Sequence, residues 1–290
     1  MISRLALGSA QFGLPYGIAN KEGQVSSDKV TQIINRARAA GMNTLDTAIS
    51  YGGSEFVLGE VGIGRWQVIS KLPGIPKDCE DIDAWVNESV DSSLKRLKIS
   101  KLRGLLLHRP EQLLGSKGDA IYQALVSIQK RGGTEKIGIS VYDPSELDSI
   151  WPRYQFDIVQ APFNILDRRL ILSGWLGRLS QAGIEIHVRS VFLQGLLLMD
   201  KASRPEKFKR WQPLWDEWHR WLTDQALTPL QACLAYVIAQ TEIDLIVVGV
   251  ESLQQLVQII DSCEKNIHEF PNDIMSGDTC LINPTEWENL

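Results

Sequence analysis

Four ionisable side chains of different kinds lie at or just after the ends of three consecutive apolar runs. Asp46 ends the first run and Tyr51 follows it in the next loop, while Lys71 and His108 end the second and third runs. Such runs are typical of buried parallel strands, and enzymes built on barrels of these strands keep their reactive groups at the strands' carboxyl ends. We therefore expect the four side chains to converge at one end of a barrel.

Together these residues suit the protonation of a carbonyl oxygen. Tyr51 is a weak acid with an unperturbed pKa of about 10. The Lys71 ammonium favours the phenolate and is expected to lower the pKa of Tyr51, with Asp46 holding Lys71 charged and in place. His108 can offer a hydrogen bond to the same oxygen. Because no side chain carries a hydride, reduction of that carbonyl requires a nicotinamide cofactor.

Each of the four side chains also has an ordinary structural explanation. Asp46 can cap the next helix, Tyr51 can belong to a glycine-rich turn, and Lys71 and His108 can end their strands in solvent. Taken singly, these explanations are the more frequent ones. Taken jointly, they require four coincidences at the end of the fold where chemistry is expected.

The elements that must hold these groups alternate along the whole chain. Apolar runs predict buried strands, and longer amphipathic stretches between them predict helices. The eight predicted strands span Leu5–Gly8, Asn43–Asp46, Gln67–Lys71, Gly104–His108, Lys136–Ser140, Asp157–Gln160, Glu185–Arg189 and Asp244–Gly249. No G-x-G-x-x-G turn, as in an open nucleotide-binding sheet, follows the first strand. The pattern predicts an α/β fold, a single-domain (β/α)8 TIM barrel over residues 1–290.

Capping residues mark several helix boundaries. Ser27 is the expected N-cap of a helix over Asp28–Ala40. Thr228 and Pro229 mark another start, with threonine as the cap and proline in the first turn, and a further helix starts at Ser252. The remaining predicted helices span Asp81–Leu97, Asp119–Lys130 and Leu170–Ala182.

Two segments do not fit the alternation. An inserted segment, about residues 197–227, carries Trp211, Trp215, Trp218 and Trp221 at a spacing of three to four residues. This spacing predicts an amphipathic helix that packs its aromatic side on the barrel, with a lid over a substrate pocket as the alternative. Residues of about 264–290 are expected to form an irregular C-terminal tail, since glycine and prolines recur in them.

Composition narrows the class of protein. A net charge of −5 over 290 residues gives no general attraction to nucleic acid or to an anionic membrane. The four cysteines are scattered without histidines at metal-ligand spacing, so we expect free thiols and no metal site. We expect neither a secretory signal nor a membrane span. These features favour a cytoplasmic protein whose partner is a small carbonyl compound.

The chain resembles the aldo/keto reductase family over most of its length. Family-like stretches cover residues 7–13, 45–52, 54–59, 69–71, 106–110, 136–140 and 159–164. The most specific of them is the D-T-A-x-x-Y-G element at residues 46–52, followed in order by a strand-end lysine and histidine. Residues 189–195 are similar to a bacterial branch of the family that is associated with sugar and surface-polysaccharide pathways.

The resemblance implies NAD(P)H-dependent reduction of an aldehyde or ketone, with a sugar-derived carbonyl as one option. It implies that Tyr51 is the general acid, that Lys71 and Asp46 tune it, and that His108 orients the substrate carbonyl. The implied cofactor-binding residues are Gly8, Ser9, Ser140, Gln160, Arg189, Ser190, Gly249, Ser252 and Gln255.

The implied cofactor lies extended across the barrel mouth, without a separate nucleotide-binding domain. Ser140 and Gln160 correspond to residues that hold the nicotinamide carboxamide. Gly249 and Ser252 correspond to the loop and helix start that bind the adenosine phosphate end, and a helix start suits an anion on physical grounds as well.

The chain departs from the family's pattern at the nicotinamide end. Val141 stands where members commonly have an asparagine, so the resemblance does not carry over one carboxamide contact. Arg189 stands where an aromatic ring often stacks on the nicotinamide. A planar guanidinium can stack there as well.

The adenosine end bears on the choice between cofactors. NADP(H) is expected over NAD(H), because most members of the family use it. Against this, Gly249, Gln255 and Ile259 stand where many NADPH-specific members have a lysine, an arginine and an asparagine. Glu251 lies close by in the sequence, and its carboxylate repels a 2′-phosphate.

Two other functions stay open at this point. A lysine enzyme on the same barrel would form a Schiff base on Lys71, which must then be neutral although Asp46 favours its protonated form. A non-catalytic regulatory subunit would bind a nicotinamide without turnover. Arg109 and aromatic residues of the inserted segment are candidates for the substrate pocket, and the sequence does not specify a substrate or an oligomeric state.

Overall fold

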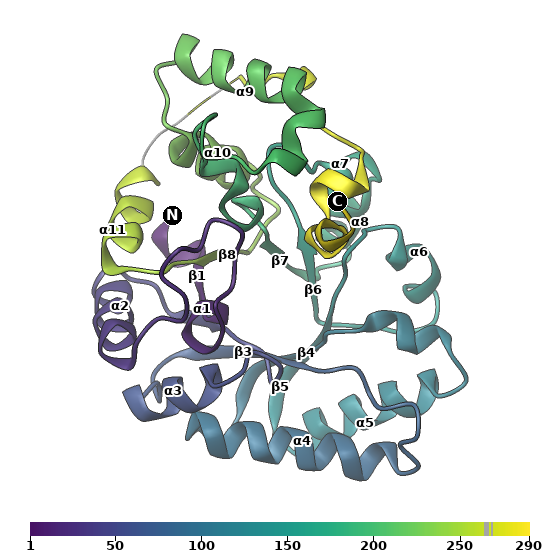
Figure 1. The fold of residues 1–290 in the computed structure, drawn as a ribbon. Helices are drawn as coiled ribbons and strands as arrows, with labels where there is room; N and C mark the ends of the chain where they lie inside the picture. The colour runs from purple at the N-terminus through teal and green to yellow at the C-terminus, as the bar shows by residue number, and fades with distance from the viewer. Residues whose placement is uncertain (264–266, 268) are drawn as a thin grey trace.

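Eight parallel strands close into a barrel in the computed structural model, which describes residues 1–263, 267 and 269–290 (Figure 1). The strands pair in chain order, and β8 pairs with β1 to close the ring. Their bounds are β1 Leu5–Gly8, β2 Thr44–Asp46, β3 Gln67–Leu72, β4 Leu102–Leu107, β5 Thr134–Ser140, β6 Ile158–Pro162, β7 Glu185–Arg189 and β8 Leu245–Gly249. The predicted (β/α)8 TIM barrel is confirmed, and no strand end differs from its predicted position by more than two residues.

The interior of the barrel is filled by side chains. Ile69, Leu106 and Ile158 form a buried cluster separate from the main core. Gly104 pairs with Ile69 between β3 and β4, and a Cβ at Gly104 would lie 2.7 Å from Ile158 Cδ1. A side chain at this position would force the isoleucines at the centre of the barrel to shift, so glycine fits the packing there best.

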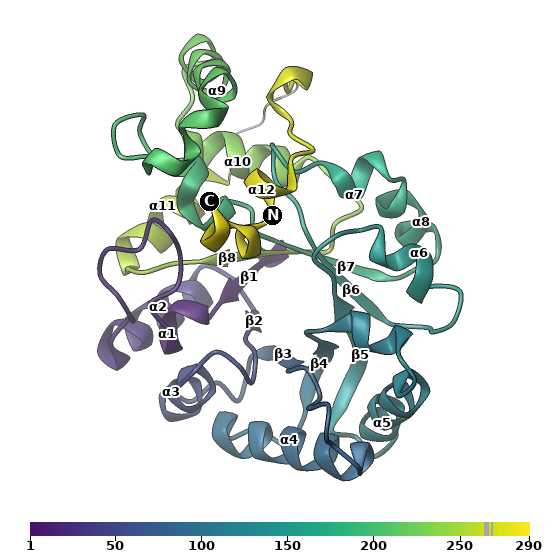
Figure 2. The same cartoon turned by 45° about the vertical axis from the view of Figure 1, so that its right-hand side comes forward.

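Helices cover the outside of the ring of strands (Figures 1 and 2). The α-helices around the barrel are α1 Ala10–Gly13, α2 Ser27–Ala39, α3 Ser54–Val61, α4 Ile82–Leu97, α5 Gly118–Lys130, α6 Glu146–Ile150, α7 Arg169–Leu172, α8 Trp175–Gln181, α10 Pro229–Ile238 and α11 Leu253–Ser262. Short 3-10 helices lie at η1 Ile2–Arg4, η2 Pro110–Leu114 and η3 Leu193–Leu198. None of the described helices has the length and apolarity needed to cross a bilayer.

Side-chain caps explain where two predicted helices begin. Thr228 Oγ1 accepts a hydrogen bond from Gln231 N at 3.2 Å, and Gln231 Oε1 accepts one from Thr228 N at 3.0 Å, which forms a capping box before α10. Ser252 Oγ accepts from Gln255 N at 3.2 Å before α11. Both predicted starts are confirmed. The cap predicted for α2 is wrong, because Ser27 is already helical and Ser26 holds the extended N-cap position.

The predicted single helix over Leu170–Ala182 is also wrong. Two shorter helices, α7 and α8, replace it. Gly174 between them has a φ of 76°, in the left-handed region that interrupts a right-handed helix. The apolar spacing on both sides of this glycine is helical, so the break depends on one residue.

The inserted segment contains η4 Glu206–Trp211 and α9 Gln212–Asp224, at the top of Figure 1. Trp215 and Trp218 are fully buried, as the spacing of the tryptophans predicts. Trp215 Nε1 donates to Phe208 O at 3.0 Å, and the Phe208 ring meets the Trp287 ring edge-on at 5.0 Å. The aromatic side of α9 therefore packs on η4 and on the C-terminal tail rather than directly on the strands.

The tail contains η5 Asn272–Ile274, α12 Thr279–Ile282 and η6 Pro284–Asn289. Ser276 N donates to Leu166 O at 2.9 Å, and Arg168 Nη2 donates to Pro271 O at 2.6 Å. Because Leu166 and Arg168 follow β6, these bonds fix the tail at the carboxyl end of the barrel. Residues 264–266 and 268 of the stretch predicted to be irregular lie outside the described residues.

An ionic cluster lies at the opposite, amino end of the barrel. Glu185, the first residue of β7, accepts hydrogen bonds from His187 Nε2 at 2.8 Å, from Arg103 Nη2 at 2.9 Å and from Lys136 Nζ. Burial raises the pKa of Glu185, but the bonds from His187 and Lys136 and the charge of Arg103 outweigh burial and lower this pKa to about 2.

We predict that Glu185→Gln destabilises the fold in a pH-dependent way. A carboxyl group with a depressed pKa stabilises the folded state above its unfolded pKa of about 4.3, and this stabilisation is lost as the pH falls toward the folded value. Glu185→Gln should lower the free energy of unfolding by about 1–3 kcal/mol at pH 7 and by clearly less at pH 3. Urea unfolding at both pH values measures this, with Glu88→Gln on the exposed side of α4 as the control. An equal loss at both pH values would contradict the assignment.

Candidate active site

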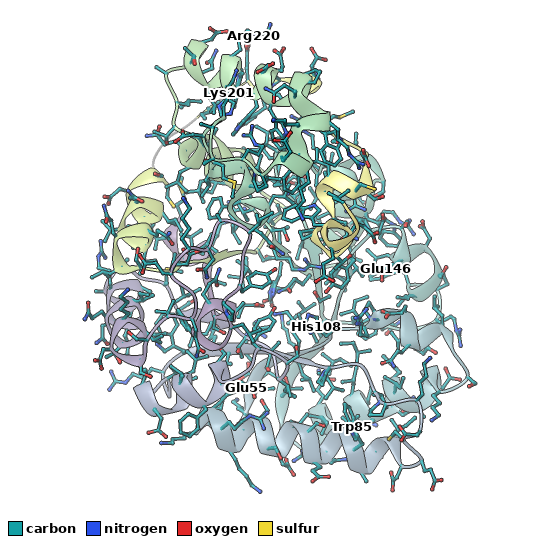
Figure 3. All side chains as sticks on the ribbon, viewed as in Figure 1. Glu55, Trp85, His108, Glu146, Lys201 and Arg220 are labelled. Carbon is teal, nitrogen blue, oxygen red and sulfur yellow. The ribbon has the colours of Figure 1, made fainter. Side chains whose placement is uncertain are left out.

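The four ionisable side chains predicted to carry chemistry meet at the carboxyl end of the barrel. Asp46 is the last residue of β2, Lys71 lies near the end of β3, His108 directly follows β4, and Tyr51 lies in the loop between β2 and α3. Figure 3 shows His108 near the middle of the molecule, with Glu146 on the α6 side of it.

Lys71 and Asp46 form a buried ion pair. Lys71 Nζ lies 2.5 Å from Asp46 Oδ1 and also donates to Thr47 O at 3.0 Å. Lys71 is 1% exposed and Asp46 is 4% exposed, so the pair is removed from water. Neither charge is stable there without the other.

Tyr51 and His108 lie beside this pair and are only half-buried. Lys71 Nζ lies 5.3 Å from the centre of the Tyr51 ring. The Tyr51 and His108 ring centres are 6.0 Å apart, with the ring planes at 77°. Two polar side chains that retain access to solvent thus stand next to a charged pair that does not.

The prediction that Lys71 lowers the pKa of Tyr51 is wrong. Burial raises the pKa of the Tyr51 phenol and the Asp46 carboxylate raises it further, against an opposing effect of Arg189. Asp46 offsets the charge of Lys71 because the two groups are in contact. The phenol is therefore un-ionised at neutral pH and holds a proton that it can donate.

His108 is neutral at the same pH. Burial lowers the pKa of His108 to about 4, and the positive charges of Lys71 and Arg189 contribute to this shift. The Ser50 hydroxyl lies 3.2 Å from His108 Nδ1. A neutral imidazole carries one N–H, so its hydrogen bonding depends on which ring nitrogen is protonated.

Tight backbone packing fixes the loop that carries Tyr51. A Cβ at Gly13, the last residue of α1, would lie 1.9 Å from Tyr51 O and 2.5 Å from Ser54 N, so only glycine allows α1 to approach this closely. Ser54 Oγ donates to Ser9 O at 2.9 Å. The sequence shows these glycines and serines but does not reveal that they meet.

A second buried carboxylate holds the helix that follows this loop. Glu55 in α3 is 2% exposed. It accepts hydrogen bonds from Ser70 at 2.8 Å and Ser93 at 2.7 Å, and from Arg96 Nε at 2.9 Å. Since Ser70 immediately precedes the site's lysine in β3, Glu55 ties the start of α3 to the strand that carries the ion pair.

The two residues predicted to hold a carboxamide connect directly to the ion pair. Ser140 Oγ donates to Gln160 Oε1 at 3.2 Å, and Gln160 Nε2 donates to Asp46 Oδ2 at 2.7 Å. Both oxygens of Asp46 are therefore occupied, one by Lys71 and one by Gln160. The structure brings Ser140 and Gln160 together with the four ionisable residues.

Arg189 borders the mouth from the end of β7. Its Nη2 donates to Val141 O at 3.0 Å and its Nη1 to Ser190 Oγ at 3.3 Å. Its guanidinium carbon lies 4.6 Å from the centre of the Tyr142 ring. Arg189 and Ser190 are thus adjacent at the mouth.

The residues predicted for the phosphate end lie at the end of β8 and directly after it. A Cβ at Gly249 would lie 2.8 Å from Gln11 Oε1, so the Gln11 side chain covers this glycine. Ser252 caps α11, and Gln255 Oε1 accepts from Glu251 N at 2.8 Å. The side chains of Ser252 and Gln255 therefore organise the start of α11.

Gly8 and Ser9 lie at the end of β1. A Cβ at Gly8 would lie 3.2 Å from Val247 Cγ1. Ser9 is 0% exposed, and its Oγ lies 2.8 Å from Ser54 Oγ. The hydroxyl of Ser9 is thus buried against another side chain of the fold.

Several residues around the mouth were not predicted. Tyr142 supports Arg189, and its position two residues beyond a strand end is a signal that the sequence offers. Tyr16 lies in the loop after α1 and accepts a hydrogen bond from Gln194 Nε2 at 3.3 Å. Burial raises the pKa of Tyr16, and Tyr51 and Arg189 also influence it, so Tyr16 lies near the site. No periodic pattern marks Tyr16, Gln194 or Gln11, because they lie in irregular loops or in a single helical turn.

The arrangement combines one un-ionised acid, one neutral imidazole and two cations, of which only Lys71 has a carboxylate partner among the described residues. Such a site can protonate a carbonyl oxygen and stabilise negative charge on it. Within the described part of the chain, no group of histidine, cysteine, aspartate or glutamate side chains could hold a metal ion.

Comparison with known proteins finds the same fold in solved structures. Among solved structures, an aldo-keto reductase of Bacillus halodurans in its holo form has a TM-score of 0.72 at 20% identity, covering 92% of this chain and 88% of that one. A glycerol dehydrogenase of Gluconobacter oxydans has a TM-score of 0.70 at 20% identity, covering 91% and 88%. These similarities show the fold. No curated protein matches the chain.

The family comparison covers almost the whole barrel. The model of the aldo/keto reductase family matches residues 4–274, from η1 to the last residue of η5. The match includes all eight strands and every residue of the site described above. The chain therefore belongs to the aldo/keto reductase family, whose members are oxidoreductases that use nicotinamide cofactors.

Proposed function

We propose that this chain reduces an aldehyde or a ketone to an alcohol, with NAD(P)H as the hydride donor and Tyr51 as the proton donor. The observation that carries the proposal is the un-ionised, half-buried Tyr51 beside a neutral His108, both next to the buried Lys71–Asp46 pair. A reduced nicotinamide supplies the hydride, which no side chain can supply.

The roles of the residues follow from their protonation states. Tyr51 donates its proton to the carbonyl oxygen as negative charge develops there, and Lys71 stabilises the phenolate that remains. Asp46 keeps Lys71 charged against the burial that lowers the pKa of this lysine. His108, being neutral, directs the carbonyl oxygen with a hydrogen bond and does not compete with Tyr51 as an acid.

The donor set at the mouth fits a nicotinamide cofactor. Ser140 and Gln160 offer a hydroxyl and an amide of the kind that bind a carboxamide, and Gln160 uses only one of its two N–H groups on Asp46. Arg189 offers a planar cation beside them. The first amides of α11, those of Leu253 and Gln254, have no partner within the helix, and such a helix start suits a phosphate. These residues would hold the two ends of the cofactor.

We propose NADP(H) as the cofactor, with a preference over NAD(H) that Glu251 weakens. Burial raises the pKa of Glu251, and the Glu22 carboxylate contributes in the same direction, which means that two acidic groups are near each other at the start of α11. Two carboxylates in this place disfavour a 2′-phosphate.

The contacts of Lys71 argue against a Schiff-base enzyme. Its Nζ donates to Asp46 and to Thr47 O and is almost fully buried, so a substrate carbonyl carbon has no path to it.

The mouth of the site is polar, with the Tyr16 hydroxyl and the Gln194 amide near Arg189. This polarity supports a hydroxylated carbonyl compound, such as a sugar, as the substrate.

We predict that Tyr51→Phe abolishes carbonyl reduction and leaves cofactor binding nearly unchanged. The change removes the donated proton and keeps the ring, so the turnover number for glyceraldehyde should fall by at least about a hundredfold. Tyr122→Phe is the control, since it removes a tyrosine hydroxyl on α5, where it donates to Gln155 O at 2.9 Å away from the site. Near wild-type turnover in Tyr51→Phe would disprove the role of Tyr51. Tight cofactor binding without any turnover in the wild type would instead favour a non-catalytic nicotinamide-binding subunit.

We also predict that Glu251→Gln raises the affinity for NADPH relative to NADH by about three- to tenfold, because it removes one negative charge near the 2′ position. Tryptophan fluorescence titration with each cofactor measures the two dissociation constants. Glu242→Gln, an exposed change between α10 and β8, is the control. An unchanged ratio in Glu251→Gln would show that this carboxylate does not face the cofactor.

A further inference from the structure

Arg189 is a cation without a carboxylate partner at the mouth of the site. Lys71, the other cation there, is paired with Asp46 at 2.5 Å. No ion pair to Arg189 occurs among the described residues, where its guanidinium donates only to a carbonyl and a hydroxyl. The carboxylate of Asp46 is already occupied by Lys71 and Gln160. The site therefore carries about one net positive charge.

The guanidinium is held in place before any ligand binds. It lies over the Tyr142 ring and donates to Val141 O, both in the segment after β5. Asn164 Nδ2, from the loop after β6, donates to Ser190 O at 3.1 Å and so fixes the backbone next to Arg189. Three consecutive strand ends thus determine the position of this charge, and its field at the mouth is permanent.

The segment after β5, which contains Tyr142, is itself anchored by ion pairs of Arg169. Arg169 Nη1 donates to Asp143 Oδ2 at 2.5 Å and its Nη2 to Asp167 Oδ2 at 2.8 Å, and Asp167 is 0% exposed. Arg169 Nη2 also donates to Tyr142 O at 3.3 Å. The Tyr142 ring, over which the Arg189 guanidinium lies, is therefore held in place.

The field of Arg189 reaches the reacting groups. Burial and the Asp46 charge raise the pKa of Tyr51, and the charge of Arg189 opposes this rise. The charge of Arg189 also contributes to the lowered pKa of His108. Since β7 lies opposite β3 in a ring of eight strands, Arg189 and Lys71 face the mouth from opposite sides. A nicotinamide that serves a carbonyl held by Tyr51 and His108 has to lie in this same mouth.

We infer that Arg189 makes the site discriminate between the two redox forms of its cofactor, binding the reduced nicotinamide more tightly than the oxidised one. This inference rests on the proposed function. The reduced ring is uncharged and the oxidised ring carries one positive charge, so an unpaired guanidinium nearby repels only the oxidised form. An aromatic residue in the same place would lack this repulsion. The consequence for the reaction is rapid release of the oxidised cofactor and weak product inhibition by it.

The test compares the dissociation constants of NADPH and NADP+, and of NADH and NAD+, by isothermal titration calorimetry. Because each pair shares its phosphates and adenosine, the ratio within a pair isolates the nicotinamide. Arg189→Gln removes the charge and keeps a planar polar group, and Arg189→Lys keeps the charge without the planar group.

We expect the wild type to bind the reduced form at least about tenfold more tightly than the oxidised form. Arg189→Gln should reduce this ratio about tenfold, mainly by strengthening binding of the oxidised form, and Arg189→Lys should retain most of it. Equal binding of both forms by the wild type would overturn the inference without any variant. An equal loss of affinity for both forms in Arg189→Gln would also overturn it, since Arg189 would then serve the phosphates. If the wild type binds neither form, the proposed function fails and this inference fails with it, which is distinct from equal binding of both forms, where only the inference fails.

Discussion

An ammonium and a carboxylate held out of water are stable together only when each of their polar atoms is paired, and the site depends on this constraint. Lys71 gives two of its three hydrogens to Asp46 and to Thr47 O, and Asp46 divides its oxygens between Lys71 and Gln160. Removing one partner of such a pair leaves an isolated buried charge, which costs several kcal/mol in typical proteins. The barrel supplies the partners from β2, β3 and β6, so the closed ring of strands brings the parts of the site together.

Other buried charges hold the loops around this pair. Glu55 connects the helix after the Tyr51 loop to β3 and α4, and Arg169 connects the segments after β5 and β6. Side chains placed in this way lose little further freedom when a substrate binds, which is a general source of catalytic efficiency. Arg189 is the exception in charge balance: it is well positioned, yet no carboxylate neutralises it in the described part of the chain.

The sequence predicts the barrel well because its signals are local. Each strand contains a short stretch of apolar residues, and Thr228 and Ser252 mark helix starts through bonds to residues three positions away. The same locality brings Asp46, Lys71 and His108 to one end of the barrel, since each stands at a strand end.

Predictions that depend on packing between distant parts of the chain are less successful. The pKa of Tyr51 moves opposite to the expected direction because burial and Asp46 act on it together, and neither effect is visible from spacing. Gly174 breaks a helix that its neighbours would otherwise continue, and Gln11 covers Gly249 from a part of the chain far away in sequence.

The central claim is that Lys71 and Asp46 act on Tyr51 as one unit. A double-mutant cycle tests it most directly, with Asp46→Asn, Lys71→Met and the double variant compared by the single-turnover rate at which the protein oxidises bound NADPH on mixing with an aldehyde. If the two residues act as one unit, each single change should slow this step by about a hundredfold or more, and the double variant should be no slower than the slower single variant. Losses that multiply in the double variant, with the fold intact by circular dichroism, would show that the two residues act independently and would contradict the account.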